Sequence, residues 1–182
     1  MTEYLKAIDH EIVRKAQRIK ILVSDLDGVM TDGGIIMDDR GVEYKRFQVK
    51  DGQIVAYLKQ HGIRVGIISG RNVPVAAKRC EQMGVDFHHH GVRDKLAMVR
   101  ELVKAYGYGF EQCAYIGDDL IDIALLAKVG LSAAPADAMP YVRERVDFIT
   151  SKKGGEGAFR EVADLILLAQ GKMESVIRSC IQ

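Results

Sequence analysis

The sequence contains no tryptophan, only three cysteines and three prolines, and almost no excess of either charge. Its formal net charge of +1 provides no basic surface of the kind that general nucleic-acid binding requires. Cys80, Cys113 and Cys180 are scattered and lack C-x-x-C spacing, which argues against a zinc site or a disulfide framework and favours reduced thiols in the cytoplasm. No apolar run reaches the ~20 residues that a membrane-spanning helix needs.

The first 18 residues predict one amphipathic helix, with Thr2 as its cap and an apolar stripe at helical spacing. Glu3, Asp9 and Glu11 make this segment acidic, and it has no apolar centre, so we do not expect a signal or transit peptide.

The rest of the 182 residues alternates between short apolar runs and amphipathic stretches. This alternation predicts a single α/β domain, a doubly wound (Rossmann-like) parallel sheet with helices on both faces. Strands are expected at residues 19–23, 64–68, 85–88, 113–116, 131–133 and 146–150. Helices are expected at residues 52–61, capped by Asp51, and at 73–83, 95–106, a segment ending at 128, 139–145, 158–169 and 173–180.

Residues 33–49 predict a β-hairpin that projects from the sheet, with its turn at residues 38–41. The arms carry exposed-looking apolar and aromatic side chains at Ile35, Ile36, Met37, Tyr44 and Phe47. Because an isolated hairpin is marginally stable in water, we expect it to pack on another surface such as a second subunit.

Two carboxylates, Asp25 and Asp27, follow the first apolar run, and Gly28 then permits a sharp turn. Residues two apart on an extended backbone point to the same side, and two close carboxylates favour a cation or a shared proton. The alternative is an ordinary solvated turn. A calcium loop is excluded because Val29, Met30 and Ile36 occupy positions that need ligands, glycine or glutamate.

Three further strand ends carry polar groups that can converge with the first, because ligands bind beyond the carboxyl ends of parallel strands. Each group alone is also explained as a turn, a solvated lysine or a helix cap. Together they favour phosphoryl transfer. The groups are Ser69, Lys95, and the acidic set Asp118, Asp119 and Asp122.

Phosphoryl transfer assigns each group a role. Asp25 would attack phosphorus and form an aspartyl phosphate, while Asp27 would protonate the leaving oxygen and later activate water. Ser69 and Lys95 would stabilise phosphate charge. Mg²⁺ prefers oxygen ligands, here Asp25, the backbone carbonyl of Asp27, and Asp118.

The arrangement resembles the haloacid dehalogenase-like (HAD) superfamily, whose four motifs match Asp25-x-Asp27-Gly28-Val29-x-Thr31, Ser69, Lys95 and Gly117-Asp118-Asp119-x-x-Asp122. A closer resemblance is to the capless 3-deoxy-D-manno-octulosonate 8-phosphate phosphatase family. Supporting stretches are Thr31-Asp32-Gly33, Phe47-x-Val49-x-Asp51-Gly52, Ser69-Gly70-Arg71, Ala114-Tyr115-Ile116-Gly117-Asp118-Asp119 and Gly154-Gly155-x-Gly157-Ala158-x-Arg160-Glu161.

The resemblance implies a cytoplasmic, Mg²⁺-dependent phosphatase in lipopolysaccharide precursor biosynthesis, with Asp119 and Asp122 supporting the metal ligands from behind. It also implies a homotetramer built by the hairpin, in which a neighbouring subunit closes the active site. Residues 151–182 form a Gly-rich segment and the C-terminal helices, and the tail from Gly154 to Arg160 would do part of that closing. No membrane or nucleic-acid partner is implied. Substrate contacts are expected from Thr31, Asp32, Lys50, Asp51, Gly70, Arg71 and Arg160.

Three alternatives stay open. Phosphatases for nine-carbon sugar-acid 9-phosphates share most of the pattern but often carry an acidic residue where this chain has Arg71, a cation suited to a sugar carboxylate. A non-catalytic assembly module would not need the full set of polar strand ends. A mutase-type phosphotransferase would need a larger cap to exclude water.

Two other patterns are discounted. Adjacent histidines on a strand point to opposite faces, so His88, His89 and His90 cannot easily share one metal ion. The run from Gly155 to Arg160 nearly matches a dinucleotide-binding loop, but Arg160 stands in place of its third glycine.

Overall fold

The computed structural model describes residues 2–181. Six parallel strands form one sheet in the order β5-β4-β1-β6-β7-β8, and this confirms the predicted α/β fold. The strands are β1 (Ile21–Ser24), β4 (Arg64–Ile68), β5 (Phe87–His89), β6 (Cys113–Ile116), β7 (Leu131–Ala134) and β8 (Phe148–Ile149).

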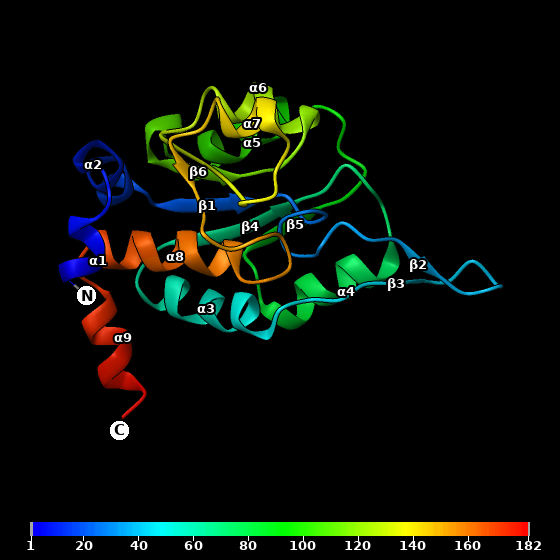
Figure 1. Cartoon of the computed structure of the whole chain (residues 1–182), viewed down its shortest axis with the longest axis horizontal. Helices are drawn as coiled ribbons and strands as arrows, with labels where there is room; N and C mark the ends of the chain where they lie inside the picture. The colour runs from blue at the N-terminus through cyan, green and yellow to red at the C-terminus, as the bar shows by residue number, and fades with distance from the viewer. Residues whose placement is uncertain (1, 182) are drawn as a thin grey trace.

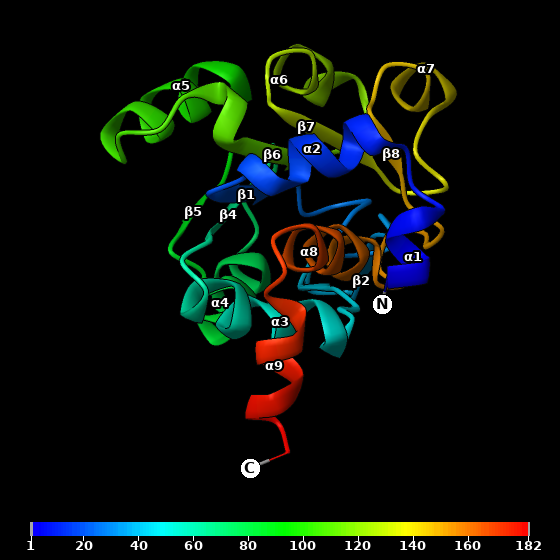
Figure 2. The same ribbon diagram turned by 90° about the vertical axis from the view of Figure 1, so that its left-hand side faces the viewer.

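Helices cover both faces of this sheet, as Figure 2 shows, with α3, α4 and α8 on one side and α5, α6 and α7 on the other. Each face has its own buried apolar cluster. The helical elements are α1 (Thr2–Lys6), α2 (His10–Arg18), α3 (Val49–Gln60), α4 (Pro74–Met83), α5 (Lys95–Ala105), η1 (Phe110–Gln112), η2 (Leu120–Asp122), α6 (Ile123–Leu126), α7 (Pro140–Arg143), α8 (Ala158–Ala169) and α9 (Met173–Ser179).

Strand β1 lies in the middle of the sheet and is buried along its whole length. It pairs with β4 on one side and with β6 on the other, and Ser24 lies beside Ile67 and Ile116. The chain order of the strands reverses at β1, and the ends of neighbouring strands diverge at such a point to leave a crevice. Residues 25–31 after β1 and residues 117–122 after β6 therefore meet at this edge.

The prediction of one N-terminal helix is wrong, because the segment forms two. Helix α1 ends at Lys6, and α2 begins after Asp9, whose carboxylate accepts a hydrogen bond from the Glu11 amide at 2.7 Å. A carboxylate that caps amides competes with helix continuation, so Asp9 starts a new helix. The cap predicted for the Thr2 side chain lies outside the described side chains.

The predicted cap of α3 is also wrong. The helix begins three residues earlier than expected, at Val49, and Gln48 is its N-cap. Asp51 is fully buried and accepts a hydrogen bond from the backbone amide of Arg160 at 2.8 Å. It therefore connects α3 to the first turn of α8.

The hairpin is present with short strands, β2 (Ile36–Met37) and β3 (Glu43–Tyr44), and it extends away from the sheet in Figure 1. Ile36, Met37 and Tyr44 are 59%, 62% and 51% exposed. Its expected burial against another subunit stays a prediction. Within residues 2–181, no helix combines the length and apolar content that crossing a membrane requires.

Candidate active site

A cleft of about 320 Å³ opens at the carboxyl ends of β1, β4 and β6. The loops after these three strands contribute its lining, as expected for a crevice where the strand order reverses. The lining residues are Asp25, Asp27, Ser69, Gly70, Arg71, Asp118, Asp119 and Ile121.

Lys95, the first residue of α5, lies beneath this cleft with a side chain that is 0% exposed. Its ammonium is 2.8 Å from Asp25 Oδ1 and 2.7 Å from Asp122 Oδ1. It also donates a hydrogen bond to the Tyr115 hydroxyl at 3.1 Å. Burial alone would lower the pKa of Lys95, but the two carboxylates outweigh it and raise that pKa. The lysine is therefore held in its charged form beside Asp25.

Asp122 is a buried anchor whose two carboxylate oxygens are both engaged. Oδ1 accepts from Lys95 and, at 2.6 Å, from the Tyr115 hydroxyl. Oδ2 accepts from the backbone amides of Asp118 and Asp119 at 3.0 and 3.2 Å. These bonds fix the turn after β6 and leave Asp122 little capacity for an additional ligand.

Asp25 and Asp118, in contrast to Asp122, retain carboxylate oxygens that can bind an additional ligand. One carboxylate oxygen from each of Asp25, Asp118 and Asp122 lies within 4.8 Å of the other two, and Asp118 Oδ1 is buried without a hydrogen-bond partner among the described residues. An unpaired buried acceptor beside a second carboxylate fits a hard cation such as Mg²⁺.

Burial is also the main reason that these two carboxyls hold their protons more tightly. It raises the pKa of Asp25 to about 7, with Lys95 opposing and Asp122 adding to the shift. Burial and the charge of Asp25 raise the pKa of Asp118 to about 8. Two carboxyls that resist ionisation together favour a site where a cation replaces their protons.

Gly28 lets the two loops approach each other this closely. Its φ of +86° lies in the left-handed region, and a Cβ there would be 2.1 Å from Asp118 Oδ2. A side chain at this position would therefore displace the Asp118 carboxylate.

Asp27 belongs to a network of charges that reaches the hairpin. Its Oδ1 accepts a hydrogen bond from the Lys45 ammonium, and its Oδ2 is 4.0 Å from Arg71. Glu43 binds both cations, Lys45 at 2.7 Å and Arg71 through two hydrogen bonds of 2.7 and 3.0 Å. Hydrogen bonds from Lys45 and Arg71 lower the pKa of Glu43.

Sequence reasoning missed Glu43 and Lys45. The alternation of charged and apolar residues along the second hairpin arm was a usable signal, because residues 43 and 45 point to the same side of a strand. That side faces the Asp25 loop.

Ser69 is 1% exposed at the end of β4, and its hydroxyl accepts a hydrogen bond from the Arg71 amide at 3.1 Å. Its backbone is held by β5, because the Ser69 amide donates to the His89 carbonyl at 2.9 Å. The hydroxyl is thus presented to the cleft from a fixed turn.

The other predicted residues are not all brought to the cleft. Gly70 and Arg71 line it, and Asp119 at its edge accepts hydrogen bonds from the Leu120 amide and the Tyr141 hydroxyl. The remaining five lie elsewhere in this chain. Thr31 is buried within its loop, Asp32 is exposed and bonded to Arg46, Asp51 is buried under α8, and Lys50 and Arg160 line a separate groove of about 630 Å³.

The Gly-rich segment packs against its own chain. The Gly155 amide donates to the Val29 carbonyl at 2.9 Å, and a Cβ on Gly154 would lie 2.0 Å from the Gly28 carbonyl oxygen. The segment thereby supports the Asp25 loop from behind. Its predicted contact with a neighbouring subunit stays a prediction.

Known proteins are similar to this chain in sequence and in fold. The haloacid dehalogenase-like hydrolase family matches residues 44–130. The 3-deoxy-D-manno-octulosonate 8-phosphate phosphatase KdsC of Escherichia coli (strain K12) is 41% identical over 167 residues, covering 92% of this chain and 89% of that protein.

Solved structures agree over most of their length. The 3-deoxy-D-manno-octulosonate 8-phosphate phosphatase from Yersinia pestis superposes with a TM-score of 0.89 at 44% identity, over 91% of this chain and 89% of that one. The phosphatase of the same name from Moraxella catarrhalis, in complex with magnesium ion, phosphate ion and KDO, has a TM-score of 0.90 at 39% identity, over 93% and 97%.

Proposed function

Because the chain belongs to the haloacid dehalogenase-like hydrolases, in the capless family of 3-deoxy-D-manno-octulosonate 8-phosphate phosphatases, we propose that it hydrolyses that sugar-acid phosphate to the free sugar acid and phosphate. The observation that carries the proposal is the buried Lys95 ammonium, 2.8 Å from Asp25 in a cleft that Ser69 and Asp118 share. A phosphate monoester needs such concentrated positive charge and a placed nucleophile.

Asp25 is the nucleophile of this mechanism. Its Oδ1 is occupied by Lys95 and by the Leu26 amide, whose hydrogen bond measures 2.7 Å, and this orients Oδ2 for attack. Oδ2 forms a bond to phosphorus while the bond from phosphorus to the sugar oxygen breaks, which leaves an aspartyl phosphate.

Asp27 moves the proton in both halves of the reaction. It donates a proton to the departing sugar oxygen, and then takes one from the water that attacks the aspartyl phosphate. The second attack breaks the bond between phosphorus and Asp25, releases phosphate and restores both carboxyls. Lys45 and Arg71 hold Asp27 toward the cleft.

The donor set fits Mg²⁺, which would be held by Asp25, Asp118 and the backbone carbonyl of Asp27. Bound there, the ion supplies charge neutralisation between the carboxylates and the phosphate. Lys95 adds a fixed ammonium from below, and the Ser69 hydroxyl donates a hydrogen bond to a phosphate oxygen.

We also propose that the hairpin mediates a homotetramer. The apolar side chains of Ile36, Met37 and Tyr44 are exposed at its tip, where this chain offers them no cover. The remaining parts of the proposal are cytoplasmic action and a place in lipopolysaccharide precursor synthesis, which rest on the family resemblance.

Asp25→Asn is the direct test of the mechanism. The amide has the same shape but is a poor nucleophile, so phosphate release should fall at least about 1,000-fold with the fold unchanged by circular dichroism. Asp39→Asn is the matched control, because Asp39 is exposed in the hairpin turn and does not line the cleft. Unchanged phosphate release from Asp25→Asn would rule out the nucleophile assignment.

A panel of phosphates tests the substrate. The eight-carbon sugar-acid 8-phosphate should be hydrolysed with a higher kcat/KM than nine-carbon 9-phosphates, hexose phosphates or nucleotides. A higher kcat/KM for a nine-carbon 9-phosphate would reassign the substrate and leave the mechanism intact.

A further inference from the structure

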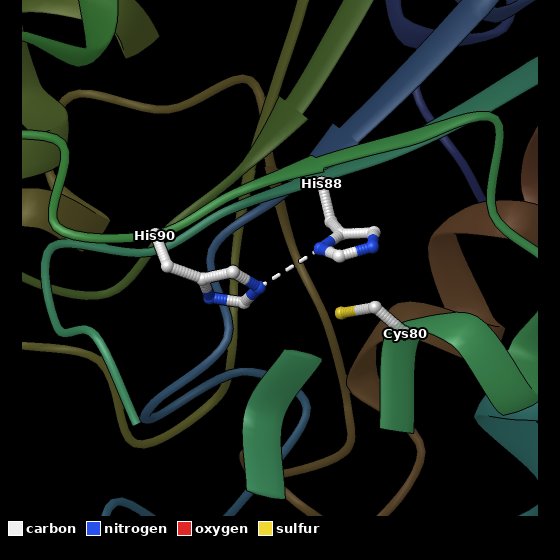
Figure 3. A group of neighbouring side chains, drawn as sticks. All are labelled: Cys80, His88 and His90. Carbon is white, nitrogen blue, oxygen red and sulfur yellow. Dashed lines mark hydrogen bonds between the residues drawn. The ribbon is translucent and has the colours of Figure 1, made fainter. Parts of the chain in front are cut away.

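A second group of metal-ligating side chains lies outside the carboxylate cleft. Cys80 comes from α4, His88 from β5, and His90 from the residue just after β5. One potential ligand atom of each lies within 4.8 Å of the others. Figure 3 shows the thiol of Cys80 directed toward the two imidazole rings, which face each other.

The geometry follows from strand alternation. His88 and His90 are two residues apart and share one face of the strand, whereas His89 points the other way. Three adjacent histidines were not expected to share one ion, but the pair at i and i+2 places two rings on one face. Cys80 joins this pair because α4 packs on the same face of the sheet.

The spacing of the two imidazoles suits a shared ion. His88 Nδ1 and His90 Nε2 are 3.0 Å apart. Two nitrogens bound to one tetrahedral zinc at 2.0–2.1 Å lie about 3.3 Å from each other. Exchanging their hydrogen bond for a metal therefore requires only a few tenths of an ångström of movement.

The donor set distinguishes this group from the carboxylates of the cleft. One thiol sulfur and two imidazole nitrogens are soft to intermediate ligands that suit zinc-like cations and not Mg²⁺.

We propose that Cys80, His88 and His90 form a binding site for a zinc-class divalent cation, with water at the fourth position. Cys80 is 0% exposed, while both histidines are only half-buried, so the cation and its water enter from the histidine side. Binding breaks the S–H bond of Cys80, and the proton leaves to solvent as the thiolate forms its bond to the metal.

A cation at this site would fix the turn from Ser69 to Arg71 as well as α4. The His89 carbonyl accepts from the Ser69 amide at 2.9 Å, and the Gly91 amide donates to the Arg71 carbonyl at 3.2 Å. The backbone of His89 and Gly91, on either side of His90, thus holds Ser69 and Arg71 in place. Tying this backbone to α4 stabilises one wall of the cleft.

Cobalt is the probe, because a Co²⁺–thiolate bond absorbs in the near ultraviolet whereas Co²⁺ on carboxylates does not. The full chain is first saturated with Mg²⁺ to fill the cleft and then titrated with Co²⁺. One thiolate-bound Co²⁺ per chain is expected, and Zn²⁺ should displace it. A titration without the thiolate band overturns the proposal.

Variants identify the ligands. His90→Gln and Cys80→Ser should abolish the band and weaken Zn²⁺ binding roughly 100-fold or more. Cys180→Ser, which removes the exposed thiol, and Asp25→Asn should both keep the band. Because Cys80→Ser alters a fully buried position, this variant can fail to fold. His90 is only half-buried, so His90→Gln is the variant that tests whether the site exists. A band that persists in His90→Gln, or that disappears in Cys180→Ser, refutes the site.

Discussion

Replacing Lys95 by methionine keeps most of the side-chain volume and removes the ammonium between two buried carboxylates. The Lys95 side chain and that of Asp122 are both 0% exposed, and Asp25 is 9% exposed. Removing one partner of such a buried pair costs about 3–5 kcal/mol of unfolding free energy. We expect a loss of this size for Lys95→Met in metal-free protein at high pH.

The loss should depend on pH in a defined direction. Burial has already raised the pKa of Asp25 to about 7, and Lys95 opposes that rise, so removing Lys95 raises it further. A folded-state pKa above the unfolded value gives stability that is present at low pH and lost as pH rises. In Lys95→Met, Asp25 therefore keeps its proton at pH values where Asp25 of the wild type has already ionised. The stability difference between the two proteins should narrow as pH falls toward about 7, and then stay constant.

Urea unfolding between pH 6 and pH 9 with a chelator measures this difference. Lys50→Met is the matched control, because Lys50 is exposed at the start of α3 and should change unfolding free energy by less than about 0.5 kcal/mol. A difference for Lys95→Met that is the same at pH 6 and pH 9, or one below 1 kcal/mol at pH 9, would refute the reasoning.

Three further expectations concern the cation, the Gly-rich segment and the hairpin. Burial raises the pKa of Asp25 to about 7 and that of Asp118 to about 8, so protons compete with Mg²⁺ for both carboxylates below these pH values. The Mg²⁺ affinity measured by calorimetry should therefore rise roughly 100-fold or more from pH 6 to pH 8. An affinity that does not change over this range would contradict the expectation. Gly154→Ala places a Cβ 2.0 Å from the Gly28 carbonyl oxygen, so it should lower the unfolding free energy by about 1–3 kcal/mol and also lower kcat. An unchanged melting temperature would contradict the packing of the Gly-rich segment on the Asp25 loop. Light scattering should report a tetramer for the wild type and a smaller species for Ile36→Lys, which places a charge on the exposed hairpin. A monomeric wild type would contradict the proposal that the hairpin mediates a tetramer.

Local signals in the sequence were sufficient for much of the fold. The bounds of β4, β6 and α8 were predicted to the residue, because each apolar stretch ends at a turn-forming or capping residue. The break between α1 and α2 was missed because the apolar stripe continues across it. The Asp9 carboxylate, which accepts from the Glu11 amide, marks the start of the second helix there.

The site residues also divide into those that local sequence signals place correctly and those that they do not. Asp25, Ser69 and Asp118 each end a strand whose parallel pairing could be inferred, so their common cleft follows from topology. Asp51 could not be placed from sequence, because its partner amide at Arg160 is 109 residues away. Cys80 lies close in sequence to His88 and His90, but its place beside them depends on how α4 folds back onto the sheet, which no local pattern indicates.

The hairpin links the chemistry to the rest of the molecule. Glu43 and Lys45 stand on its inner side, and with Asp27 and Arg71 they make a group of two negative and two positive charges. If Arg71 holds an anionic sugar carboxylate, as the sequence predicts, that carboxylate has to compete with Glu43 for the same guanidinium. We therefore predict that a movement of the hairpin changes whether Arg71 binds Glu43 or a substrate carboxylate. We expect any contact that fixes the exposed Ile36, Met37 and Tyr44 to bias that choice, because Glu43 lies on the same two short strands.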